Sequence, residues 1–136
     1  MKTSNFKEAG LLRNAIAIAQ GVPRGWIGLR FLALAPPWWL LKAARAPGGN
    51  AIYDRHFGEQ LGQLDPRTVY DQLLQLAGPD PILLCWEPFN VCCHRRMVAE
   101  WFEQALGIEI PELGHVRSES LSYAELTAAA EGLKAS

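Results

Sequence analysis

The feature that most constrains the fold is a short apolar segment typical of a strand, followed by a segment with the apolar spacing of a single helix. Pro81 to Cys85 is short and continuously apolar, which indicates a strand buried on both faces, as in a parallel sheet. After a loop, His94 to Leu106 has the spacing of a helix, and Gly107 provides its end. The residues expected on the inner face of this helix are Met97, Val98, Trp101 and Ala105.

Other segments repeat this alternation of strand and helix. Further strands are expected at Met1 to Asn5, Ala15 to Ala19 and Ile108 to Ile110. Further helices are expected at Trp38 to Arg45, at Asn50 to Leu64, between Asp65-Pro66 and Gly78, and after the capping box Ser122 to Glu125. The alternation predicts a single α/β domain with a small, mostly parallel sheet flanked by helices. In such sheets ligands bind beyond the carboxyl ends of the strands, which is where Cys85 lies.

Two of these helices have apolar residues at helical spacing. The inner positions expected are Ile52, Phe57 and Leu61 in the first, and Val69, Leu73 and Leu76 in the second. Between residues 21 and 49 the pattern is instead broken by prolines and glycines. We interpret that stretch as a functional loop or lid around the helix at Trp38 to Arg45.

Composition limits the class of protein. A chain of 136 residues with 49% apolar and 20% charged residues is typical of one globular domain. The longest apolar stretch, Phe31 to Leu41, is too short to cross a bilayer and contains two prolines, so no membrane segment is expected. The opening residues show no apolar signal core, and the three cysteines lie within nine positions. We therefore expect reduced thiols and a cytoplasmic protein.

Charge is unevenly distributed along the chain. Residues 1–60 carry eight Lys and Arg against three Asp and Glu, whereas residues 61–136 carry five against eleven. A basic half suits an anionic partner such as nucleic acid, but such charge also serves solubility alone.

The candidate site is the segment CWEPFNVCCHRR, from Cys85 to Arg96. A helix that begins near Cys93 offers backbone N–H groups and a positive dipole end to an anion, and Arg95 and Arg96 add forked donors for phosphate or carboxylate. The positive charge of the helix start and of the two arginines would also lower the pKa of a thiol at Cys93. The expected catalytic residues are Cys85 or Cys93 as nucleophile or orienting donor, and Glu87 or His94 as acid or base.

Structural interpretations of the same residues remain open. Cys85 can be a small core residue, His94 can pack, and the arginines can be solvated, although positive charge is unfavourable at a helix start. A zinc site is a further alternative, but Cys92-Cys93-His94 lacks the spaced pairs of a zinc knuckle.

The segment LLCWEPFNVCCHRRMVAEW resembles the signature of the domain of unknown function 488 (DUF488) family, in its shorter form. The TSNF start, the AIAIA strand, the LAPP stretch and the LDPRTV helix start resemble the same family, over about residues 3–112. The resemblance implies an α/β fold with a pocket. The positions that it marks are Thr3, Ser4, Tyr53, Cys85, Glu87, Cys93, His94 and Arg95.

The chain also departs from the family pattern. Phe57 stands where a tyrosine is usual, Cys92 doubles the motif cysteine, and the tail lies outside the pattern. We therefore expect a family-like domain over residues 1–113 and a helical extension over residues 114–136 that packs on it.

Two functions fit these observations. We favour a small enzyme acting on a phosphate-bearing ligand such as a nucleotide or nucleic-acid base, held by Thr3, Ser4, Tyr53, Arg95, Arg96 and Trp38. The alternative is a non-enzymatic module that binds nucleic acid or protein through the basic half and the Trp-rich loop, a segment that also suits a homodimer contact. The sequence identifies no cofactor.

Overall fold

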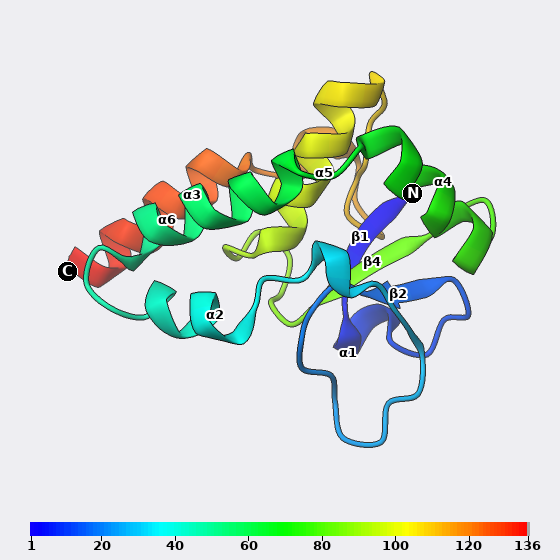
Figure 1. The fold of residues 1–136 in the computed structure, drawn as a ribbon, viewed down its shortest axis with the longest axis horizontal. Coiled ribbons are helices and arrows are strands. Elements are labelled where there is room, and N and C mark those ends of the chain that lie inside the picture. Colours follow the sequence, from blue (N-terminus) through cyan, green and yellow to red (C-terminus); the bar gives the residue numbers. More distant parts are fainter. Residues whose placement is uncertain (136) are drawn as a thin grey trace.

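Within the described residues, the protein forms one sheet of four parallel strands in the order β1, β4, β2, β3. Figure 1 shows the first three of these strands side by side. The computed structural model describes residues 1–135. The strands are β1 (Lys2–Asn5), β2 (Ala15–Ala17), β3 (Leu29–Arg30) and β4 (Ile82–Cys85). Strand β4 lies at the centre and is buried at every position, which confirms the parallel α/β fold and the strand buried on both faces.

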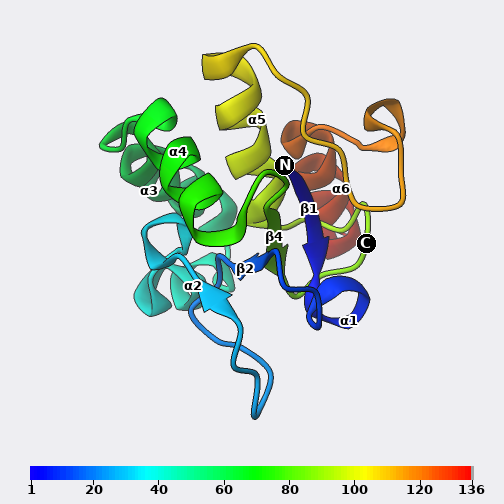
Figure 2. The same ribbon diagram turned by 90° about the vertical axis from the view of Figure 1, so that its right-hand side faces the viewer.

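The described residues also form six helices. They are α1 (Phe6–Ala9), α2 (Trp38–Ala44), α3 (Gly49–Gly62), α4 (Pro66–Ala77), α5 (His94–Leu106) and α6 (Tyr123–Ala135), with 3-10 turns at Leu32–Leu34 and Arg117–Glu119. Figures 1 and 2 show α3, α4 and α5 on one side of the strands and α1 on the other. None of the helices described is both long and apolar enough to span a membrane.

Each face of the sheet has its own core, because side chains alternate along the strands. On the helical face, Ile16 and Leu83 pack with Phe57, Val98 and Phe102. On the opposite face, the strands contribute the small or aliphatic residues Ala15, Ala17, Ile82 and Leu84, which pack with Phe6, Ala9, Cys85 and Cys93. The two cysteines of the motif therefore belong to the smaller core.

The helix boundaries follow local signals in the sequence. Asp65 Oδ2 accepts a hydrogen bond of 2.9 Å from Thr68 N at the start of α4, and Gly78 ends that helix. Ser122 and Glu125 form the expected capping box of α6, with both bonds at 3.1 Å. The predicted bounds of α5 are the observed ones.

Some predicted positions are wrong. Ile108 to Ile110 is not a strand, because side chains occupy the backbone groups of Ile110. Ile110 N donates to Glu103 Oε2, and Ile110 O accepts from Arg96. The segment pairs with β1 only through an isolated β-bridge between Glu112 and Thr3. Ile52 and Leu76 are 40% and 47% exposed, and Ala105 is exposed while Phe102 is buried in its place. The two-residue strand β3 was not predicted.

Candidate active site

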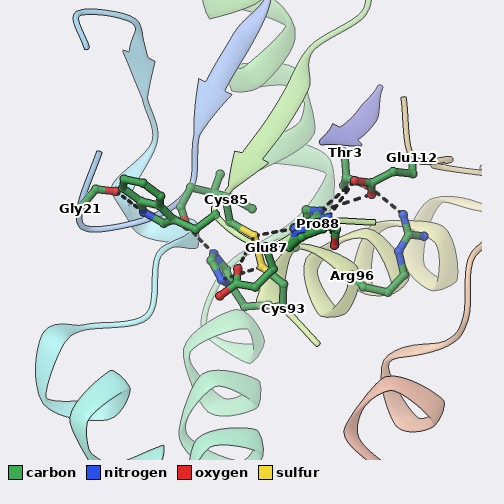
Figure 3. Close-up of a disulfide and its surroundings, with 12 residues drawn as sticks. Thr3, Gly21, Cys85, Glu87, Pro88, Cys93, Arg96 and Glu112 are labelled. Carbon is green, nitrogen blue, oxygen red and sulfur yellow. Dashed lines mark hydrogen bonds and ion pairs between the residues drawn. A yellow bond between two sulfur atoms is a disulfide. The ribbon is translucent and has the colours of Figure 1, made fainter. Parts of the chain in front are cut away.

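The motif cysteines meet where β4 ends and α5 begins. Cys85 is the last residue of β4 and Cys93 is the N-cap residue of α5, and their sulfur atoms form a disulfide (Figure 3). The expectation of three reduced thiols is therefore wrong for this pair, because the strand end and the helix start bring the two sulfurs together. Both residues are buried, at 1% and 7% exposure.

Cys92 lies outside this pair. Its Sγ is 3.9 Å from Thr127 Oγ1 of α6, and the residue is half-buried. The doubled cysteine of the motif therefore faces a different neighbour from Cys93.

Polar groups surround the sulfur of Cys85. Glu87 Oε2 lies 3.4 Å from it, and Arg95 donates to it from Nη1 at 3.0 Å. Figure 3 shows Glu87 beside the two sulfur atoms. A carboxylate and a guanidinium are thus within reach of the same sulfur.

His94 lies in the first turn of α5 with its ring buried. Its Nε2 is hydrogen-bonded to the backbone oxygen of Ile18, and its Nδ1 is 3.8 Å from Cys93 Sγ. Burial lowers the pKa of His94 to about 4, so the ring is neutral near pH 7. A neutral ring that donates from Nε2 leaves an acceptor at Nδ1, which faces the sulfur of Cys93.

Phe57 packs edge-on against the ring of His94, with centroids 5.5 Å apart. Its side chain is fully buried. Phe57, at the position where the family pattern has a tyrosine, therefore contributes to the packing of His94.

The two arginines predicted to hold an anion are engaged with protein atoms. Arg95 Nη2 pairs with Glu112 Oε1 at 2.8 Å, and these two side chains are 3% and 7% exposed. Arg96 donates to Ile110 O at 3.0 and 2.9 Å and to Thr3 Oγ1 at 3.0 Å, and burial lowers its pKa. Their donors are thus directed at acceptors inside the protein.

Glu112 is the residue of this network that the sequence did not reveal. Its Oε2 accepts a bond of 2.7 Å from Thr3 Oγ1, in addition to the pair with Arg95. Two buried arginines require an acidic or carbonyl partner. The chain has fourteen Asp and Glu, so the sequence alone does not select the partner.

Thr3 and Ser4 lie on β1, the edge strand next to β4. They are not at the cysteine pair. Thr3 is fully buried in the Glu112 network. Ser4 borders a separate hollow of about 340 Å³ that also includes Glu8 and His115.

Two hollows flank the cysteine pair. The larger, of about 460 Å³, reaches Cys85, and the smaller, of about 190 Å³, reaches Cys93. We call them the Cys85 hollow and the Cys93 hollow. The residues that line both are Leu41, Glu87 and His94.

The hollows are lined both by residues of the predicted site and by residues outside it. Trp38 lines the Cys85 hollow and Tyr53 lines the Cys93 hollow. Burial, then Cys92 and Glu87 nearby, raise the pKa of Tyr53 above its usual range. The lining residues outside the predicted site include Arg45 and Trp86 in the Cys85 hollow and Tyr123 in the Cys93 hollow. The basic and aromatic character of the segment around Trp38 was the signal for Arg45, whereas Tyr123 comes from the distant C-terminal helix.

Comparison with known proteins identifies a family for most of the chain. The family model described as the active DUF488-N3 subclade matches residues 7–106. No curated protein and no solved structure matches the chain.

Proposed function

Because this chain belongs to the DUF488 family, in the subclade described as active DUF488-N3, we propose that it is a small enzyme acting on a phosphate-bearing aromatic ligand. The ligand class is a nucleotide or a nucleic-acid base. One observation carries the proposal: Cys85, Glu87 and His94 line the same hollow as two tryptophans and an arginine. Reactive groups and groups suited to hold such a ligand therefore converge at one place.

The Cys85 hollow offers surfaces for an aromatic ring. Trp38 is 64% exposed, and Trp86 is 53% exposed with its indole N–H bound to Gly21 O at 2.9 Å. Bases stack on exposed aromatic side chains without a sequence requirement. The volume of about 460 Å³ is in the range of small-molecule sites, which is roughly 300–1,000 Å³.

Arg45 supports the phosphate part of the proposal. It lines the Cys85 hollow from the end of α2 and is exposed, whereas the donors of Arg95 and Arg96 are directed at protein acceptors. An exposed guanidinium at the edge of a site can bind phosphate in a bidentate manner. We therefore assign the anion contact to Arg45 in place of the start of α5.

The proposed chemistry requires the reduced cysteines, as in the cytoplasm. Reduction frees Cys85 beside Glu87 and Cys93 beside the acceptor Nδ1 of His94. A thiol next to a neutral imidazole is an arrangement that activates sulfur as a nucleophile or a donor. Glu87 is then available to transfer a proton to or from the ligand.

The test is ligand-dependent stabilisation of the reduced protein, with nucleoside mono-, di- and triphosphates as probes. A compound that binds only the folded state raises the melting temperature. We expect one of them to do so, and we expect Trp38→Ala and Arg45→Ala each to weaken binding about tenfold, which corresponds to roughly 1.4 kcal/mol.

Arg67→Ala is the matched control, because Arg67 is an exposed arginine on α4 that pairs with Asp71 at 3.4 Å. Its binding is expected to equal that of the unmodified protein. Indifference of the reduced protein to every nucleotide, or equal losses in Arg45→Ala and Arg67→Ala, would contradict the proposal.

A further inference from the structure

We infer that Cys85, Cys93 and His94, when the cysteines are reduced, bind one zinc ion that has an open coordination position. The metal site goes beyond the proposed function, whereas any role of the ion in the reaction rests on it. The zinc alternative considered from the sequence used Cys92, and the structure replaces that residue with Cys85.

The three ligand atoms are close enough to share an ion. The two Sγ atoms and a ring nitrogen of His94 all lie within 4.8 Å of one another. In a tetrahedral zinc site with bonds of about 2.3 Å to sulfur and about 2.0 Å to nitrogen, the ligand atoms lie roughly 3.5–3.8 Å apart. The distance of 3.8 Å between Cys93 Sγ and His94 Nδ1 already fits that spacing. After reduction the two sulfurs have to move apart, and the widest separation, up to 4.8 Å, has to shorten by about 1 Å.

The backbone leaves room for an ion between the sulfurs. The Cα atoms of Cys85 and Cys93 are 7.4 Å apart. Most disulfides join Cα atoms about 4.4–6.8 Å apart, so this spacing is wider than a direct sulfur bridge requires. Reduction thus allows the two thiolates to separate around an ion while β4 and α5 stay in place.

The surroundings orient the ligands as they do in metal sites. The ring of His94 is fixed by the hydrogen bond from Nε2 to Ile18 O, which directs Nδ1 toward Cys93. A histidine that binds a metal ordinarily donates its other ring N–H to a carbonyl or carboxylate in this way. Arg95, held by Glu112, donates to Cys85 Sγ and so favours the thiolate.

The donor set also identifies the kind of ion and the kind of site. Two thiolates and an imidazole favour zinc over magnesium or calcium, which prefer oxygen ligands. Three protein ligands leave the fourth position of a tetrahedral site open, as in catalytic zinc centres. The hollows on both sides give solvent or ligand access to the cluster, and Glu87 is placed to take a proton from a water molecule there.

The test is a zinc titration of the reduced, metal-stripped full chain against a chromophoric chelator, followed by Co²⁺ substitution to detect thiolate ligation in the absorption spectrum. We expect one ion per chain. Cys85→Ser and Cys93→Ser are each expected to lose at least tenfold in affinity and the cobalt–thiolate band. Cys92→Ser is the matched control and is expected to bind like the unmodified protein.

Circular dichroism checks that each variant is folded, and His94→Gln, which removes a ligand from the first turn of α5, is a second test if a cysteine variant does not fold. No zinc binding by the reduced protein, or an equal loss in Cys92→Ser, would overturn the inference. Zinc binding without any nucleotide binding refutes only the proposed function. Nucleotide binding by a protein that binds no zinc refutes only the metal site.

Discussion

Arg95 is a buried charge whose partners are all provided by the protein. Its guanidinium contacts Glu112, the backbone oxygen of Pro88 and the sulfur of Cys85, with Nη2 at 2.8 Å from Glu112 Oε1. Removing a charge from water is costly, and the partners offset that cost only while all are present. The pair therefore fixes the position of Cys85 more than it adds to the free energy of unfolding.

At this scale we predict that Glu112→Gln lowers the free energy of unfolding by about 3–5 kcal/mol, because Arg95 then stays buried without a counter-charge. The double variant Arg95→Met with Glu112→Leu is expected to lose much less than the sum of the two single changes. Denaturant unfolding measures all three variants.

Asp71→Asn is the control, because the Arg67–Asp71 pair is exposed at both side chains. Its loss is expected to stay below about 1 kcal/mol. A loss in Glu112→Gln no larger than in this control would show that the buried pair does not hold the site.

Among the elements, the ends of the helices depend on single residues. Gly107 ends α5 with φ 66°, a left-handed conformation, whereas Gly62 is the last residue of α3 and lies in the helix. A Cβ atom added at either glycine meets no atom within 4 Å, so backbone conformation alone distinguishes the two positions.

We predict opposite effects of alanine at these two glycines. Gly107→Ala is expected to destabilise the protein by about 1 kcal/mol, because alanine disfavours positive φ. Gly62→Ala is expected to be neutral or to stabilise by up to about 1 kcal/mol, because it reduces the entropy of the unfolded chain. Chemical denaturation of both variants checks this, and a change of the same sign in both would contradict it.

The same elements show how far sequence reasoning extends. The bounds of α5 follow from Gly107 and the periodic apolar residues, but its inner face is rotated toward Phe102, which packs against Tyr70 of α4 with centroids 5.9 Å apart. That rotation is set by a neighbouring helix and not by spacing within α5. The short β3 and the Glu112 bridge likewise depend on pairing with distant segments.

The sequence predicted the site residues that lie close together along the chain, but it did not predict contacts between residues that are far apart along the chain. Cys85, Glu87, Cys93 and His94 meet because a strand end and the next helix start enclose one loop. The long-range pair of Glu112 with Arg95 has no local pattern that would predict it.

In the whole molecule, the C-terminal segment is joined to the part that matches the family. The match ends at residue 106, yet Arg117 pairs with Glu103 at 2.6 Å and Asn90 Oδ1 accepts from Leu121 N at 3.0 Å. Tyr123 lines the Cys93 hollow and donates to Asp54 of α3 at 2.7 Å. These contacts connect the tail to α3, α5 and the loop that contains the motif.

We therefore predict that residues 1–113 and 114–136 unfold together in one transition. Tyr123→Phe removes the hydrogen bond to Asp54 and is expected to cost about 1–2 kcal/mol, because the acceptor is charged. If the extension belongs to the same cooperative unit, the unfolding midpoints reported by far-UV circular dichroism and by tryptophan fluorescence must shift by equal amounts in this variant.

Tyr70→Phe is the control, since the Tyr70 hydroxyl makes no hydrogen bond with the described residues, and its unfolding midpoint is expected to change less. Two separate transitions, or a Tyr123→Phe shift seen by only one of the two probes, would show that the extension folds apart from the domain and that its contribution to the Cys93 hollow is peripheral.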